Sequence, residues 1–461
     1  MKIQSHFFRP ISLAVALALS GTGAPAVSQI LAPPPVADAK TGGQSLGAGA
    51  DVSLPPLPPV VPPAQKLTLA QVIAYAQTHS PQLLAAGYGV AAARANYVGQ
   101  RVPANPTVGF SGLNNTVAPT YFGDLSNYVV YLPIETSGKL RWRTRQSKNE
   151  WLQSQADAQT TGITVQQSVE NAYISLQAAN RALTDEQEAY ADALKLRELT
   201  RKQFEAGGSP ETNAIRAQVA LTQETANFYS AINSVQQARA GLNNVIGQDA
   251  QAPIDAAEPL EYRPVTLELD ELRTLAAKNR PELASAEYNR RALSAAASLA
   301  RAQLYPDVVL GKPLQGTNNI ELGFTLPLFD FGGIRGATQQ AQKQEKAQEA
   351  VLRQIRQNVG LDVQTAYNAL NLAAQTAEAY RSGILPQSES LLRRVTQGYQ
   401  LGASTILDLI DAQATLRTVR IAYYGAIAQH RQALAQLERA TGAPLAALRS
   451  APLPPIALPA K

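Results

Sequence analysis

The stretch YQLGASTILDLIDAQATL, Tyr399–Leu416, decides the fold, because it joins two long helical patterns through a turn at Gly402. An earlier stretch, FEAGGSPETNAIRAQVAL at Phe204–Leu221, follows the same plan. The matching positions are Phe204 and Tyr399, Gly207 and Gly402, Ser209 and Ser404, and the pairs Ala217/Leu221 and Ala412/Leu416. The sequence therefore predicts two helical hairpins of one design.

The similarity between the hairpins extends over most of the chain. Anchor segments recur in the same order, displaced by 200 residues, then by 194 and finally by 195. They pair Leu67–Ala86 with Leu267–Ala286, Pro106–Val108 with Pro306–Val308, Leu132–Arg141 with Leu326–Arg335, and Leu242–Gly247 with Leu437–Gly442. A unit of about 200 residues is far longer than a solenoid repeat. We predict a duplicated fold with repeats at 67–264 and 265–442 and a C-terminal tail at 443–461.

The composition excludes several classes of site. The 461 residues include no Cys, three His and one Met, so disulfides, thiolate zinc sites and a catalytic thiol are absent. The net charge of +5 comes from basic residues dispersed along helices, with one cluster at Lys139–Arg145 that is typical of a solvated helix start near a membrane surface. We expect no nucleic acid partner and no cofactor, and no nucleophile or phosphate-loop pattern indicates an enzyme.

The N-terminus is typical of an exported protein. Lys2 and Arg9 precede the apolar run Ile11–Leu19, and small residues near Ala26 offer a cleavage site, which predicts a signal peptide at 1–26. The run is shorter than the roughly 20 apolar residues of a membrane-spanning helix. Residues 27–66 are rich in Pro, Gly and Ala and predict an extended linker. The mature chain is then either a soluble periplasmic protein or an outer-membrane β-barrel.

Long helices dominate both repeats. Each repeat opens with a helical segment, Leu69–Gln100 or Leu269–Gln303, that has a Pro near its start. No Pro interrupts Gly138–Phe204, so this helix can run for about 100 Å at 1.5 Å per residue. Apolar residues at alternating spacings of four and three indicate coiled-coil packing. They are Val165, Val169, Ala172, Leu176, Ala179 and Leu183 in the first repeat, and Val359, Val363, Ala366, Leu370, Ala373, Ala377, Tyr380 and Ile384 in the second.

Each repeat also carries a short strand pair. Ile320–Leu326 alternates apolar and polar residues, and Asp307–Gly311 is its expected partner across a turn at 315–319. In the first repeat the expected strands are Thr107–Leu113 and Asn127–Leu132. Two hairpins bury little by themselves, so we expect them to pair with strands of further chains.

A signal peptide followed by two units of helix, strand pair and long helical hairpin resembles the outer-membrane efflux protein family typified by TolC. The motifs that carry the resemblance are Pro81 and Pro281, the passages Leu132–Gly138 and Leu326–Gly332, and above all Tyr399–Leu416. Ile134–Arg143 is further similar to a passage of the CzcC-like heavy-metal branch. The resemblance implies a mainly α fold in a homotrimer, with a long α-helical barrel and a 12-stranded transmembrane β-barrel to which each chain gives four strands. Ile320, Leu322, Phe324 and Leu326 would then face lipid, and Glu321 and Thr325 the lumen.

The same resemblance implies the function. The chain would be the outer-membrane channel of a tripartite efflux system, reaching through the periplasm to an adaptor (membrane fusion) protein and an inner-membrane pump, most often of the RND type. Cations or drugs are possible substrates, and the sequence does not choose between them. The alternative is a periplasmic coiled-coil adaptor or scaffold without a pore. Two complete copies, each with its own alternating strand pair, speak against that alternative.

The family resemblance also assigns site residues. Asp408 and Asp411 stand where the family lines the periplasmic aperture, so that a three-fold axis would gather six carboxylates and raise some of their pKa values. An alternative is that the pair merely favours a helix N-terminus. The turns Gly207-Gly208-Ser209 and Gly402-Ala403-Ser404 would be the adaptor-docking tips. Tyr399 would tie neighbouring helices near the aperture, although Ser404 stands where the family often has an Arg.

Overall fold

The computed structural model describes residues 65–110, 128–314, 320–325 and 331–445. The expected signal peptide, nearly all of the expected linker, the turn at 315–319, Leu326 and the tail beyond Leu445 lie outside these residues. Within the described residues, no helix combines the length and the apolar character needed to cross a membrane.

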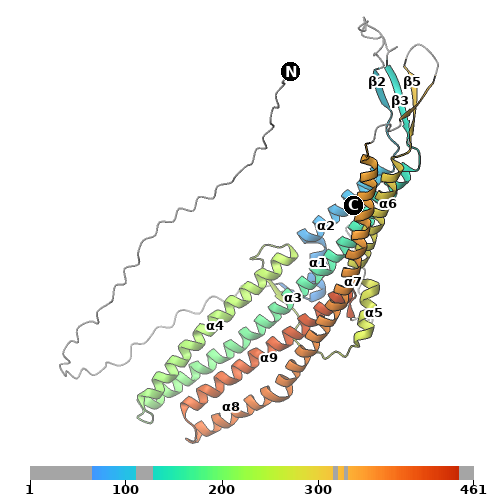
Figure 1. Cartoon of the computed structure of the whole chain (residues 1–461). Helices are drawn as coiled ribbons and strands as arrows, with labels where there is room; N and C mark the ends of the chain where they lie inside the picture. The colour runs from blue at the N-terminus through green and yellow to red at the C-terminus, as the bar shows by residue number, and fades with distance from the viewer. Residues whose placement is uncertain (1–64, 111–127, 315–319, 326–330, 446–461) are drawn as a thin grey trace, which may run out of the picture. The chain divides into compact units, whose positions relative to one another are not determined.

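Both repeats contain the same order of helices (Figure 1). The first repeat has α1 (Leu69–His79), α2 (Pro81–Gln100), α3 (Lys139–Glu205) and α4 (Glu211–Ile246). The second has α5 (Leu269–Asn279), α6 (Pro281–Ala302), α7 (Gly333–Ala379), the π-helical turn η1 (Tyr380–Ile384), α8 (Leu385–Gln400) and α9 (Ile406–Thr441). The predicted order of elements is confirmed, and α4 and α9 have the same length of 36 residues.

The first helical segment of each repeat is divided in two, where the sequence predicted one helix. The break falls at Ser80 and at Arg280, whose ψ angles of 122° and 116° are extended. The following residue is a proline at the first position of the next helix in both cases. Proline disfavours helical backbone in the residue before it but fits the first helical turn, which explains both the break and the restart.

The long helices differ between the repeats. Helix α3 is continuous over 67 residues, as predicted. In the second repeat, five residues of π-helix separate α7 from α8, and the Leu385 N–H bonds to the Tyr380 carbonyl. Pro386 in the first turn of α8 has no N–H to offer a helical partner, which favours the wider turn. The heptad pattern fails there, because Ile384 is exposed.

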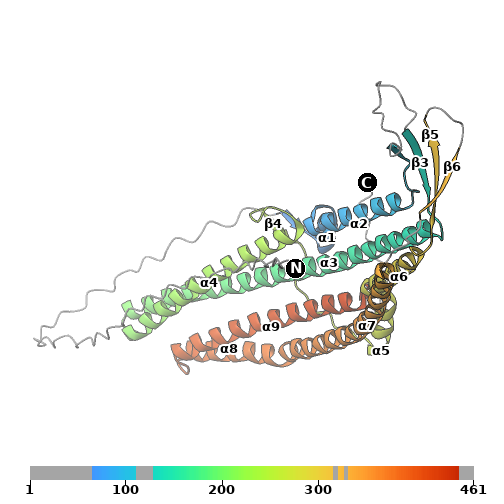
Figure 2. The same cartoon turned by 45° about the horizontal axis from the view of Figure 1, so that its top comes forward.

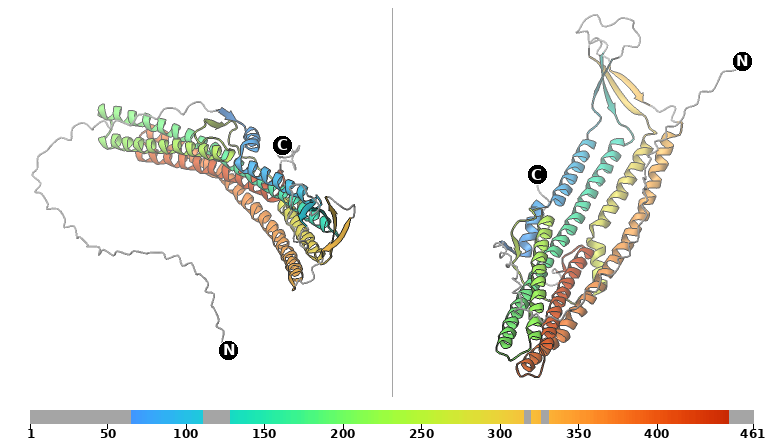
Figure 3. Two further views of the ribbon diagram at one scale, coloured as in Figure 1. Left: turned by 90° about the horizontal axis from the view of Figure 1, so that it is seen from above. Right: turned by 90° about the vertical axis from the view of Figure 1, so that its left-hand side faces the viewer.

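The helices form a layer whose neighbours change along its length (Figures 2 and 3). Near the tips the order across the layer is α4, α3, α9 and the α7–α8 segment, and near the sheet it is α2, α3, α6 and α7. Equivalent core residues fill both repeats, for example Val165, Val169 and Leu176 in one and Val359, Val363 and Leu370 in the other. The predicted heptad positions up to Ala377 therefore form the core.

Four strands form one antiparallel sheet in the order β2 (Thr107–Phe110), β3 (Tyr128–Ile134), β5 (Asp307–Pro313) and β6 (Glu321–Thr325). The predicted strand pairs are confirmed over the described residues, outside which residues 111–113 and 127 of the first pair lie, and β3 and β5 join the two pairs across the repeats. Strand β3 runs two residues beyond the predicted Leu132, and β5 two beyond Gly311. A parallel pair that the sequence did not predict, β1 (Gln65–Leu67) with β4 (Ile254–Ala256), includes the last two residues of the expected linker.

The register of this sheet gathers apolar residues on one face. Leu132 lies opposite Leu310, which lies opposite Leu322. The next row on the same face, two residues along each strand, contains Ile134, Val308 and Phe324. In the single chain this face is open to solvent: the exposed fractions are 69% for Ile320, 61% for Leu322 and 66% for Phe324. Strands β2 and β6 form the edges of the sheet in the described part of the chain.

Candidate functional site

The two hairpin turns use the same hydrogen bonds. In the second turn the Gly402 N–H bonds to the Tyr399 carbonyl and the Ala403 N–H to the Gly398 carbonyl. In the first turn Gly207 bonds to Phe204 and Gly208 to Gln203. Gly207 and Gly402 have φ of 74° and 78°, as expected for a helix that ends in the left-handed region. Gly208, Ala403 and the rest of both tips are exposed, with Ser209 and Ser404 half-buried.

Asp408 and Asp411 lie three residues apart at the start of α9, and both are exposed. Asp408 closes a capping box, in which its Oδ2 accepts from the Thr405 N–H at 2.8 Å and from the Thr405 hydroxyl at 2.7 Å. These bonds hold the pKa of Asp408 below its usual range. In the single chain the Asp408 carboxylate thus caps the N-terminus of its own helix. Within the described residues, no such bond joins the Asp411 carboxylate to the helix end. The expected raising of pKa values by a carboxylate ring concerns the assembled trimer and stays a prediction.

Tyr399 connects the two hairpins near their tips. Its half-buried hydroxyl lies 3.5 Å from the Gln203 Oε1 at the end of α3, and burial raises the pKa of this phenol. Its ring packs beside a small apolar cluster formed by Leu196, Ala217, Ile406 and Leu409. This cluster and the tyrosine hold α8 and α9 against α3 and α4.

Sequence reasoning missed a group of charged residues between the hairpins. Arg417 of α9 forms ion pairs with Glu224 of α4 and, at 3.6 Å, with Glu186 of α3. Arg420 lies 3.2 Å from Glu188 and 4.0 Å from Asp185, both on α3. All of these residues except Glu186 border a cavity of about 70 Å³. The heptad pattern gave no sign of them, because charged residues in long helices usually form a solvated face.

We call these residues, Asp185, Glu186, Glu188, Glu224, Arg417 and Arg420, the ionic cluster. Two of its carboxyl groups are buried without hydrogen-bond donors for some of their oxygen atoms. Both Asp185 oxygens are buried and accept no hydrogen bond within the described residues, and the same holds for the Glu186 Oε2. Burial raises the pKa of Asp185 and of Glu186, and the facing arginines only partly oppose that change. The cluster therefore links the hairpins while disfavouring the charge of two of its own members.

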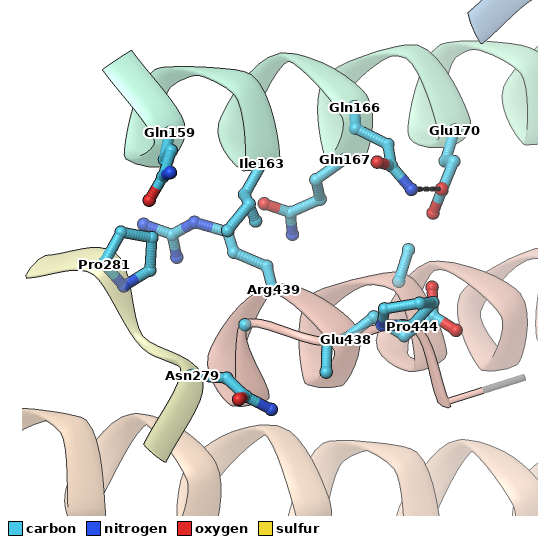
Figure 4. Close-up of a pocket in the computed structure, with 13 residues that line it drawn as sticks. Gln159, Ile163, Gln166, Gln167, Glu170, Asn279, Pro281, Glu438, Arg439 and Pro444 are labelled. Carbon is cyan, nitrogen blue, oxygen red and sulfur yellow. Dashed lines mark hydrogen bonds between the residues drawn. The ribbon is translucent and has the colours of Figure 1, made fainter. Parts of the chain in front are cut away.

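A cavity of about 340 Å³ lies where α9 ends against the break between α5 and α6 (Figure 4). Glu170 of α3 borders it and accepts a 2.9 Å bond from Gln166. Burial raises the pKa of Glu170. Among the described residues, no group of three His, Asp or Glu side chains is placed to hold a metal ion, here or elsewhere.

Comparison with known proteins gives a direct match to one family model. The model of the outer membrane efflux protein family matches residues 72–248 and 272–443, which together make up most of the chain. The chain belongs to the outer membrane efflux protein family.

Two curated relatives illustrate its range. The cobalt-zinc-cadmium resistance protein CzcC of Cupriavidus metallidurans is 29% identical over 254 residues, which are 51% of this chain and 58% of the relative. The probable efflux pump outer membrane protein TtgC of Pseudomonas putida is 24% identical over 348 residues, covering 71% of this chain and 69% of the relative. The chain thus aligns with about three fifths of CzcC and two thirds of TtgC.

Solved structures share the fold. A membrane protein from Pseudomonas aeruginosa has a TM-score of 0.68 at 23% identity, covering 81% of this chain and 93% of that one. The outer membrane protein VceC of Vibrio cholerae has a TM-score of 0.67 at 19% identity, with coverage of 81% and 96%. The predicted fold class, mainly α with a small β part, is confirmed.

Proposed function

We propose that this chain forms a homotrimeric channel in the outer membrane that conducts substrates from an inner-membrane pump and its periplasmic adaptor. Three copies of the four-stranded sheet would close a 12-stranded barrel, and three helical layers would close a tube below it. The channel would work without catalysis or a cofactor. The family resemblance implies a pump that is most often of the RND type, and the likeness to the cobalt-zinc-cadmium resistance protein CzcC supports metal cations as one class of cargo beside drugs.

The open four-stranded sheet carries this proposal. Its apolar face, with Leu322 and Phe324, is exposed in the single chain, and β2 and β6 lack outer neighbours in the described residues. Unpaired strand edges are not tolerated in lipid, so a sheet of this kind has to close with other copies. A periplasmic scaffold without a pore has no use for such a face.

The helical tips supply the second part of the proposal. Each tip reverses the chain with an exposed Gly turn, and an adaptor would dock on Gly207–Ser209 and Gly402–Ser404. The exposed Asp411 and the capping Asp408 would line the aperture of the trimer. Rings of carboxylates attract cations and bind divalent ions, so they would favour cation passage at this end.

Single-channel conductance in planar bilayers tests the proposal. We expect the purified trimer to form cation-selective pores that divalent cations block. In the double variant Asp408→Ala/Asp411→Ala we expect larger currents, weaker cation selectivity and weaker divalent block, because the carboxylate ring is gone.

Glu211→Ala provides a matched control. Glu211 is an exposed carboxylate in the first turn of α4, at the other tip, and its removal should leave selectivity and block nearly unchanged. Folded trimers that never form pores would contradict the channel. Pores whose selectivity is the same with and without the two aspartates would contradict the ring.

A further inference from the structure

A group of exposed arginines surrounds the junction between the helices and the sheet. Arg101 and Arg301 end α2 and α6 at equivalent positions of the two repeats. Arg141 and Arg335 are likewise equivalent in the first turns of α3 and α7, and Arg145 lies one turn below Arg141. Within the described residues, none of these five side chains has an ion-pair partner. We name them the junction arginines.

Hydrogen bonds place most of the junction arginines at one level. Arg143 of α3 donates to the carbonyls of Gln100 and Val102, which fixes the end of α2 beside the start of α3. Lys139 donates to the Tyr305 carbonyl and pairs with Asp307, which fixes the end of α6 at the same height. Figure 1 shows the upper end of α7 next to the strands as well. The arginines therefore follow the foot of the sheet.

The carboxylates described at this level pair with other cations. Asp307 and Glu135 are the carboxylates at this level in the described residues, and they are paired with Lys139 and Arg143. The paired cations are buried or half-buried, whereas the junction arginines are exposed. The inner cations thus hold the junction together, whereas the outer ones have no ion-pair partner among residues 65–110, 128–314, 320–325 and 331–445.

Aromatic side chains accompany the arginines. The guanidinium groups of Arg141 and Arg145 lie 5.7 and 5.9 Å from the ring of Trp142. Tyr305, just before β5, and Phe331, just before α7, are 57% and 97% exposed. Aromatic and basic side chains at one level are typical of the boundary between membrane and water.

We propose that the junction arginines bind the phosphate headgroups of anionic phospholipids in the periplasmic leaflet of the outer membrane. The inference rests on the proposed function, because it requires the sheet above the arginines to lie in the membrane. The trimer would repeat the arginines three times around the channel. Guanidinium groups suit this role, since they bind phosphate oxygens in pairs and stay charged. Such binding would fix the depth of the channel in the bilayer and therefore the reach of its tips.

Lipid titration of the full-length trimer in detergent tests this proposal. The probes are dioctanoyl phosphatidylglycerol, which is anionic, and dioctanoyl phosphatidylcholine, which is zwitterionic, and binding is measured by native mass spectrometry. We expect the anionic lipid to bind more tightly. In the triple variant Arg101→Gln/Arg141→Gln/Arg145→Gln that preference should fall on the order of tenfold or more, with little change for the zwitterionic lipid.

A control with three other arginines keeps the test specific. Arg353, Arg356 and Arg394 are exposed on α7 and α8, and their change to Gln removes the same charge away from the junction. An equal loss in this control, a retained preference in the junction variant, or equal binding of both lipids to the unaltered trimer would overturn the proposal. Bilayer conductance of the same samples separates this from the proposed function: pores without lipid preference refute only the lipid site, and folded trimers without pores refute the channel.

Discussion

At the scale of single residues, one glycine in each repeat lets the last helix of that repeat pack against the break in its first helical segment. Gly247 ends α4 with a φ of 80°, and a Cβ there would lie 2.5 Å from the His79 carbonyl oxygen. Gly442 ends α9 with a φ of 69°, and its Cβ would lie 2.9 Å from the Asn279 carbonyl oxygen. Each helix end thus abuts the break that precedes α2 or α6. Arg280 completes the second join by donating to the carbonyls of Arg439 and Ala440.

Gly442→Ala should therefore destabilise the chain by roughly 1–3 kcal/mol, because a non-glycine residue is strained at this φ and because its Cβ meets backbone that has little room to move. The measurement is thermal unfolding of the purified trimer. Gly425→Ala is the control, since Gly425 lies within α9 with nothing within 4 Å of its added Cβ. Equal melting temperatures for Gly442→Ala and the unaltered trimer would show that the join is loose.

At the scale of elements, the ionic cluster is the main polar link between the two hairpins. Asp185 and Glu186 face Arg417 and Arg420 of α9, Arg181 and Glu188 of their own helix, and Glu224 of α4. Burial raises the pKa of both carboxyl groups. A group with a raised pKa in the folded state favours folding at low pH, and this contribution is lost as the pH rises through the raised value.

The double variant Asp185→Asn/Glu186→Gln should accordingly change how stability depends on pH. At pH 7.5 we expect its melting temperature to equal or exceed that of the unaltered protein, since two disfavoured buried charges are gone. The difference should shrink as the pH falls toward about 4, the ordinary pKa of these groups, because both are then protonated in the unaltered protein. Melting curves between pH 4 and 7.5 measure it.

Asp192→Asn/Glu198→Gln removes two exposed carboxylates from the same helix and should leave the pH profile unchanged. A variant that becomes relatively more stable toward acid pH would reverse the assigned sign. It would mean that the arginines stabilise the two charges by more than burial disfavours them.

The elements themselves could largely be predicted from the sequence. Heptads place Val363 and Leu370 in the core by local geometry alone, and the alternation in β6 reports a sheet with one apolar face. The ionic cluster could not be predicted, because Asp185 and Arg420 are brought together only by packing of helices from different repeats. The capping role of Asp408, in contrast, agrees with the Thr405-x-x-Asp408 spacing, which is the sequence pattern of a capping box, and with the alternative that the aspartate pair favours a helix N-terminus.

At the scale of the whole molecule, the helical layer of one chain has two open sides. Tyr88 of α2 and Val219 of α4 lie on one side, at 74% and 64% exposure. Leu361 and Leu372 of α7 lie on the other, at 65% and 66%. Apolar surface on two different sides suits a heterologous contact, which closes into a ring. The homotrimer that the family resemblance implies would bury both sides.

Leu361→Asp/Leu372→Asp should therefore prevent assembly, because the trimer would have to bury two charges without partners. Light scattering after size-exclusion chromatography should give the mass of one chain, while circular dichroism keeps its helical signal. Leu401→Asp is the control, since Leu401 is 84% exposed at the tip and outside both sides. Trimers that persist in the double variant would place the contact elsewhere.

The π-helical turn at Tyr380–Ile384 explains why the spacing of the repeats changes from 194 to 195 residues. The helical run in the second repeat, from Gly333 to Gln400, contains one residue more than α3. An extra residue in a regular α-helix would rotate everything beyond it by about 100°. The wider turn takes up that residue in a local bulge. The inserted residue therefore does not rotate the second tip away from the first. The two hairpins keep the same orientation toward each other although one repeat is longer than the other.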